Sequence, residues 1–128
     1  MKIFFDEDNG TAIPRALQLV RAPCEEILYP RKDGPVPLGS ADVDWISHVG
    51  SRGYLAFSQN KRLLDVPHER AALVAARLGI VFTSTGRSPA YETLRLLLNR
   101  WDWLREIDRN EVRPFAFILP FSGPPANV

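Results

Sequence analysis

Short, β-prone apolar runs alternate with stretches of helical periodicity along this chain, and this alternation constrains its fold more than any other feature. The runs lie at residues 2–5, 25–29, 54–58, 80–84 and 113–121. Strands that alternate with helices are typical of a mostly parallel sheet with helices on both of its faces. We therefore expect a single α/β domain of three layers, in which helices flank a mostly parallel central sheet.

The segments between these runs carry apolar residues at the three- and four-residue spacing of amphipathic helices. This spacing predicts helices over residues 11–21, 40–51, 66–78 and 89–107. In the last and longest of them, Ser88 is the expected N-cap and Pro89 the first helical residue. Pro114 and Pro120 favour an edge position in the sheet for the final strand.

The length of 128 residues fits one domain, which we place at residues 1–122 with a frayed tail at residues 123–128. No apolar run approaches the roughly 18 residues needed to cross a bilayer, and the N-terminus lacks the apolar stretch of a signal peptide. We therefore expect a cytoplasmic protein with no membrane association. The lone cysteine, Cys24, excludes an internal disulfide.

The charges of the chain nearly balance, with 16 Lys and Arg against 15 Asp and Glu and a formal net charge of +1. This balance argues against a polybasic nucleic-acid binder. The charges are nevertheless unevenly distributed. Residues 1–44 hold 5 basic and 8 acidic residues, whereas residues 45–128 hold 11 and 7. Such a distribution is consistent with an acidic pocket on a mildly basic body.

Three adjacent acids, Asp6, Glu7 and Asp8, follow the first predicted strand. Ligands of parallel α/β sheets bind at the carboxyl ends of the strands. Acids crowded at such a position repel one another, so a binding site explains them better than the alternative of a solvated turn. Carboxylate oxygens suit hard cations such as Mg²⁺ and Mn²⁺. We therefore predict a metal site at the end of the first strand.

Other polar residues at comparable positions each have two interpretations. Asp42 and Asp44 lie at the start of a predicted helix, where the helix dipole explains an acid as well as a ligand role does. Glu69, near the start of the next helix, is interpreted as an ordinary helix acid.

The residues after the third and fourth predicted strands are equally ambiguous. Ser58 and Asn60 are typical of turns as well as of sites. Lys61 and Arg62 are interpreted either as surface charges or as contacts to a phosphate backbone. Thr83, Ser84 and Thr85 lie at the end of the fourth predicted strand.

Three phrases occur in order along about the first two thirds of the chain. They are IFFDEDNG at residues 3–10, DVDWI at residues 42–46 and SQNK at residues 58–61. A helix with Glu–Arg–Ala and the strand IVFTSTG follow them. The order and spacing resemble the PIN-like nuclease domains, in particular the VapC-type toxin branch, whose members open with a similar FFDEN phrase. The resemblance covers residues 2–86.

This resemblance implies a metal-dependent endoribonuclease that acts as the toxin of a type II toxin–antitoxin pair. It implies Mg²⁺ or Mn²⁺ as cofactor, and RNA and a cognate antitoxin as partners. The metal ligands implied are Asp6, Asp8 and Asp42. The implied catalytic residues are Asp6, Asp42, Asp44 and Asn60, and the implied substrate-binding residues are Ser58, Lys61 and Arg62.

Asn60 departs from the family pattern, because the family usually has an Asp there. An amide supplies a neutral oxygen, so the site loses one negative charge. This departure motivates an alternative, a catalytically weak PIN-like module that binds RNA or a protein partner. A phosphatase or phosphotransfer domain with Asp6 as its nucleophile is a further hypothesis.

The predicted helix over residues 89–107 is more apolar than one buried stripe requires. Trp101, Trp103 and Leu104 lie on adjoining sides of it. We take this surface as a hypothetical homodimer interface.

Overall fold

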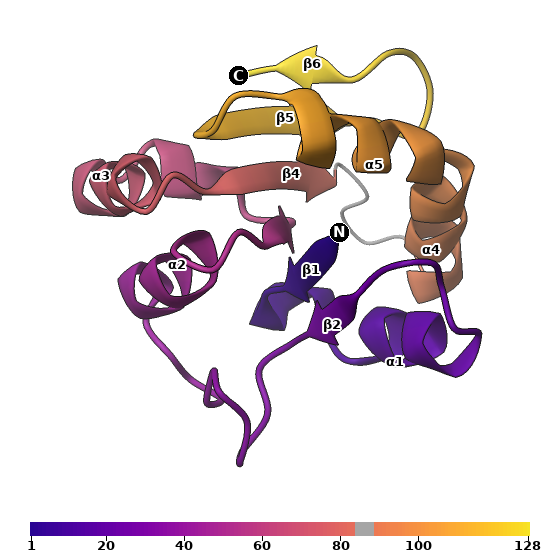
Figure 1. Cartoon of the computed structure of the whole chain (residues 1–128), viewed down its shortest axis with the longest axis horizontal. Helices are drawn as coiled ribbons and strands as arrows, with labels where there is room; N and C mark the ends of the chain where they lie inside the picture. Colours follow the sequence, from indigo (N-terminus) through magenta and orange to yellow (C-terminus); the bar gives the residue numbers. More distant parts are fainter. Residues whose placement is uncertain (84–88) are drawn as a thin grey trace.

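A six-stranded sheet forms the centre of the protein in the computed structural model, which describes residues 1–83 and 89–128 (Figure 1). The strand order is β2-β1-β3-β4-β5-β6, and every pairing is parallel except the antiparallel pairing of β5 with β6. The predicted three-layer α/β fold with a mostly parallel sheet is confirmed. The strands are β1 (Lys2–Phe5), β2 (Glu26–Leu28), β3 (Leu55–Ser58), β4 (Gly79–Thr83), β5 (Phe115–Leu119) and β6 (Ala126–Asn127).

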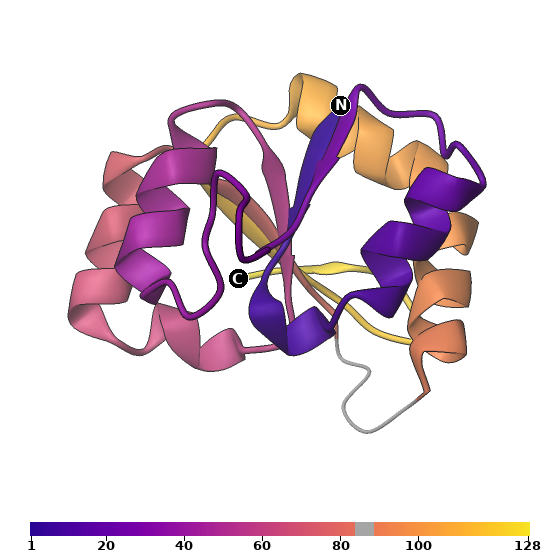
Figure 2. The same cartoon turned by 90° about the horizontal axis from the view of Figure 1, so that it is seen from below.

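Helices cover both faces of the sheet. One face carries α1 (Ala12–Leu19), α4 (Ala90–Asn99) and α5 (Trp101–Asn110), and the other carries α2 (Asp42–Gly50) and α3 (Pro67–Ala75) (Figures 1 and 2). Two short 3₁₀ helices, η1 (Glu7–Asn9) and η2 (Lys61–Leu64), follow β1 and β3. None of the helices in the described part of the chain is long and apolar enough to cross a membrane.

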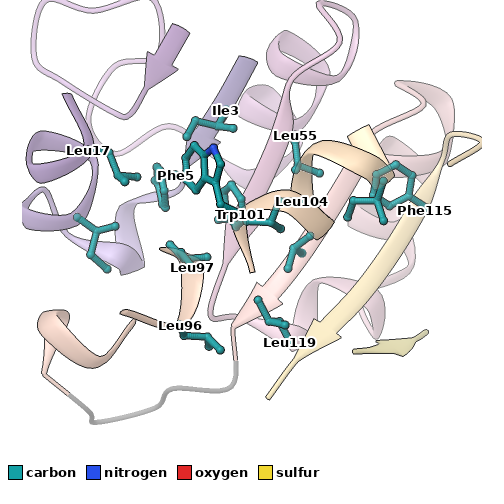
Figure 3. Packing of buried hydrophobic residues seen from close by; sticks show 14 residues of the cluster. Ile3, Phe5, Leu17, Leu55, Leu96, Leu97, Trp101, Leu104, Phe115 and Leu119 are labelled. Atoms are coloured by element: carbon teal, nitrogen blue, oxygen red, sulfur yellow. The ribbon is translucent and has the colours of Figure 1, made fainter. Parts of the chain in front are cut away.

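The residues of the central strands are buried on both faces, as expected of a parallel sheet between two helical layers. In β1, Phe4 packs toward α2 and Phe5 packs toward α1, because successive side chains point to opposite faces. Phe5 stacks on Phe57 of β3 with ring centroids 4.9 Å apart. Figure 3 shows the cluster around Phe5, to which Leu97 of α4 and Leu104 of α5 also belong.

The long helix predicted over residues 89–107 is instead two helices, α4 and α5, separated at Arg100. The apolar spacing continues across this break, so periodicity alone predicts one helix. The break leaves Leu97 and Leu104 in the same buried cluster while α4 and α5 take different directions (Figure 1). Trp101 and Leu104 are buried in that cluster, and Trp103 packs edge-on against Phe117. These residues, which suggested a dimer interface, therefore contribute to the interior.

The end of the chain also differs from the expected arrangement. The final predicted strand was expected at an edge, but β5 lies between β4 and β6. Pro114 and Pro120 fall just outside β5, so neither interrupts its ladder. The tail at 123–128, expected to be frayed, contains β6. Ser84, the expected end of the fourth strand, and Ser88, the expected N-cap, lie outside the described residues.

Candidate functional site

The candidate site lies at the carboxyl ends of β1 and β3, where the order of the strands in the sheet changes direction. From β1 the chain moves outward to β2 and then returns past β1 to β3, so β1 and β3 are neighbours at a topological switch point. Crevices at such points, at the carboxyl ends of the strands, are the usual ligand sites of open α/β sheets. Figure 2 shows η1 and η2, which follow β1 and β3, at one common edge of the sheet.

Asp6 is the buried acid at this point. It follows β1 directly, its side chain is only 5% exposed, and its backbone N–H donates to the Phe57 carbonyl at 3.2 Å. Burial raises the pKa of Asp6 to about 9, and a hydrogen bond with Asp8 and the charges of Asp8 and Asp42 act in the same direction. A hydrogen bond with Ser58 opposes this shift. Without a compensating cation, the Asp6 carboxyl is therefore protonated at neutral pH.

Asp42 approaches Asp6 from the first turn of α2. Its side chain is half-buried, and its Oδ1 accepts a hydrogen bond from Trp45 Nε1 at 2.8 Å. Asp44 is exposed in the same turn. Two residues along an α-helix are about 200° apart around the axis, so these two acids face different directions. The charge of Asp42 therefore acts on Asp6, whereas Asp44 lies on the outer side of the helix.

Asp8 connects the end of β1 to the end of β3. It lies in η1, and its Oδ1 accepts a hydrogen bond from the backbone N–H of Gln59 at 3.3 Å. Its side chain also hydrogen-bonds Asp6. Asp8 is itself exposed, so it forms the solvent side of the acidic pair.

Ser58 and Asn60 have different roles in the exit from β3. Ser58 is fully buried, and its hydroxyl hydrogen-bonds Asp6 and accepts from the Asn60 backbone N–H at 3.0 Å. The Asn60 side chain caps η2, because its Oδ1 accepts from the Arg62 backbone N–H at 3.2 Å. The structure thus places Ser58 against the carboxylate and Asn60 at the turn. Lys61 and Arg62 are exposed on η2 beside them.

Glu69, which its sequence position predicts to be an ordinary helix acid, also belongs to this region. It is half-buried in the first turn of α3. Burial raises its pKa, and so do the charge of Asp42 and a hydrogen bond with Asp42, although His68 opposes the shift. No local signal identifies Glu69, because its contact with Asp42 depends on the packing of α3 against α2.

Asp6 and Asp42 are suitable ligands for the predicted divalent cation, Mg²⁺ or Mn²⁺. Among residues 1–83 and 89–128, no three His, Cys, Asp or Glu side chains converge as a ready-made metal centre. Mg²⁺, however, is commonly held by one or two carboxylates, with water and substrate phosphate completing its coordination. Burial is the main cause of the raised pKa of Asp6, and the charges of Asp8 and Asp42 add to it; a cation beside Asp6 and Asp42 would favour the ionised carboxylate against all of these effects.

The first 85 residues match a family model described as a PIN like domain. The match spans the strands, loops and acids just described, and the chain belongs to the PIN-like domain family. Comparisons with curated proteins and with solved structures gave no match.

Proposed function

We propose that this PIN-like domain is a metal-dependent endoribonuclease. The observation that carries the proposal is the placement of Asp6, a buried carboxyl at the switch point of the sheet, within reach of the charges of Asp8 and Asp42. Stability does not require a buried acid crowded by two others, since the crowding disfavours its charged form. A site that takes up a cation explains all three acids together.

Asp6 and Asp42 would hold Mg²⁺ or Mn²⁺, and Asp8 would add negative charge on the solvent side. Such an ion supplies a water that is nucleophilic at neutral pH and neutralises charge on the scissile phosphate. The buried Ser58 hydroxyl donates a hydrogen bond to the Asp6 carboxylate and so keeps it in place. Asp6 gives up its proton when the cation binds, because a ligating carboxyl must be ionised.

Lys61 and Arg62 are the proposed contacts to RNA phosphates. Both are exposed, and they follow Asn60 directly at the edge of the sheet that holds the acids. Phosphate contacts of this kind position a nucleic acid without reading its sequence. The cleavage chemistry and the substrate contacts would then occupy neighbouring positions on η1 and η2.

A role as the toxin of a type II toxin–antitoxin pair extends this proposal. Its support is the resemblance of the IFFDEDNG, DVDWI and SQNK phrases to the VapC-type branch. The cognate partner would be an antitoxin protein. Expression of the wild-type chain alone should inhibit growth, and expression of D6N should not.

RNA cleavage by the purified protein tests the proposed activity. We expect cleavage with Mn²⁺ or Mg²⁺, none with EDTA, and none by D6N with either metal. The matched control is D33N, which removes an exposed acid from the loop before α2. Cleavage that persists in D6N at the wild-type rate would rule out Asp6, and equal cleavage in EDTA would rule out the metal.

One observation favours the second candidate function, a catalytically weak PIN-like module that binds RNA or a protein. The Asn60 side chain is engaged as the cap of η2, so the position where the family usually has an Asp contributes no charge. This candidate predicts RNA retention that is the same in EDTA and in Mn²⁺, with no cleavage in either.

A further inference from the structure

Asn9 donates a short hydrogen bond to the Asp6 carboxylate. It is the last residue of η1 and is 9% exposed. Its Nδ2 donates to Asp6 Oδ1 at 2.8 Å and to the Phe57 carbonyl at 2.9 Å, with a longer contact of 3.4 Å to the Asp6 carbonyl. One amide nitrogen thus joins the acid after β1 to the backbone of β3.

The orientation of this amide is fixed by its surroundings. All three atoms around Nδ2 are hydrogen-bond acceptors, so the reversed amide would place its oxygen against three other oxygens. The Asn9 Oδ1, on the other side, is buried and has no hydrogen-bond partner among the described residues. A buried acceptor without a partner is unfavourable for folding. Asn9 therefore donates to Asp6 in an orientation that leaves its own amide oxygen without a hydrogen bond among the described residues.

We propose that Asn9 is a positioning residue that holds the Asp6 carboxylate in the orientation needed to bind the catalytic cation. This inference rests on the proposed function. Groups that hydrogen-bond a metal ligand fix its orientation, and their loss typically weakens metal binding or activity. Asn9 anchors Asp6 Oδ1 to a strand in the centre of the sheet, so this oxygen keeps its position while the carboxyl group also hydrogen-bonds Asp8 and Ser58.

A purely structural role, in which Asn9 only closes the turn of η1, is the competing explanation. The turn has a backbone hydrogen bond of its own, from the Asn9 N–H to the Asp6 carbonyl at 3.2 Å. A substitution that removes the amide but keeps this backbone bond therefore separates the two roles. N9L keeps the branching of the side chain at Cγ but is bulkier, and N9A is a smaller second variant.

The experiment measures Mn²⁺ affinity by calorimetry, and kcat and KM for RNA cleavage, in the wild type, N9L and N9A. The matched control is D108A, which breaks the 2.6 Å ion pair of Asp108 with Arg113. Arg113 also donates to the carbonyl of Tyr54, just before β3, so this pair lies at the opposite edge of the sheet from Asp6. D108A loses stability without touching the site.

We expect N9L and N9A to bind Mn²⁺ about 10- to 100-fold more weakly, with a lower kcat, a KM for RNA within about twofold of the wild type, and no such change in D108A. Wild-type Mn²⁺ affinity in a folded N9L or N9A would overturn the inference. An equal loss in D108A, or failure of both Asn9 variants to fold, would also overturn it, because Asn9 would then serve the fold. A wild type that binds no Mn²⁺ would overturn the proposed function itself, which is a different result.

Discussion

Trp45 of α2 stacks on Phe4 of β1 with ring centroids 5.1 Å apart, and this pair connects the two central acids of the site. Phe4 lies two residues before Asp6 on the strand. Trp45 donates its indole N–H to Asp42 Oδ1 at 2.8 Å. The buried contact between Phe4 and Trp45 therefore sets the position of Asp42, at the start of α2, relative to Asp6, which follows β1.

Removal of the indole donor should weaken the site more than the fold. W45F keeps an aromatic ring against Phe4 but removes the hydrogen bond that the indole donates to Asp42. We expect a loss of about 1 kcal/mol in the free energy of unfolding, and Mn²⁺ binding weakened by about tenfold. Calorimetry and urea unfolding measure both. W103F, whose ring packs against Phe117, is the control, and equal Mn²⁺ affinity in W45F and the wild type would refute the role of Trp45.

The stability of the metal-free protein should fall as the pH rises from about 5 to about 8. The pKa of Asp6 is about 9 in the folded protein, against its ordinary value of 3.8, so within this window the folded state holds a proton that the unfolded state has lost. Stability then decreases by up to about 1.4 kcal/mol per pH unit. D6N cannot titrate and should lack this component. Urea unfolding at several pH values in EDTA measures the difference, and parallel pH profiles of D6N and the wild type would contradict it.

Restoration of an acid at position 60 should strengthen cation binding. Asp is as good an N-cap as Asn, so N60D can keep the hydrogen bond from the Arg62 N–H while adding a negative charge near Ser58. We expect tighter Mn²⁺ binding and faster RNA cleavage in N60D. N60A should lose about 1 kcal/mol of stability with the cap and gain neither property. Unchanged affinity in N60D would place residue 60 outside the metal site.

The close contact of α2 with α3 should tolerate no side chain at Gly50. A Cβ there would lie 2.6 Å from the Ala76 Cβ and 2.9 Å from the Ala76 carbonyl oxygen. G50A should therefore push the two helices apart and lower the free energy of unfolding by about 1–3 kcal/mol. S47A, at an exposed position of the same helix, should change it little. Thermal unfolding compares the two, and equal melting temperatures would show that the helices separate without cost.

The sequence predicts most of the sheet, because the residues of β1, β3 and β4 are buried on both faces of the sheet and therefore form short apolar runs. Such runs indicate strands even when the neighbouring strands are not known. It fails at Arg100, since the apolar spacing continues through the break between two helices. It also fails at β6, whose residues carry no strand pattern and pair because the edge of β5 is available.

The candidate site, like the sheet, is predicted from the sequence only in part. Asp6 and Asp8 are predicted because acids directly after a buried strand are unusual, and the family match over residues 1–85 confirms the PIN-like family. Glu69 and Asn9 are missed because each looks ordinary in its own segment. The contact of Glu69 with Asp42 exists only after α2 and α3 have packed together. The hydrogen bond of Asn9 to Asp6 is local, but its bond to the Phe57 carbonyl exists only after β1 and β3 have paired.

Calorimetric titration of the metal-free protein with Mn²⁺ tests the central claim most directly. We predict one specific binding event per chain in the wild type, release of a proton from Asp6 on binding, and no binding event in D6N. The released proton is detected as a dependence of the heat on the ionisation enthalpy of the buffer. A wild type that gives no binding heat, or a D6N variant that binds as tightly as the wild type, would contradict the assignment of Asp6 as the centre of a metal-dependent site.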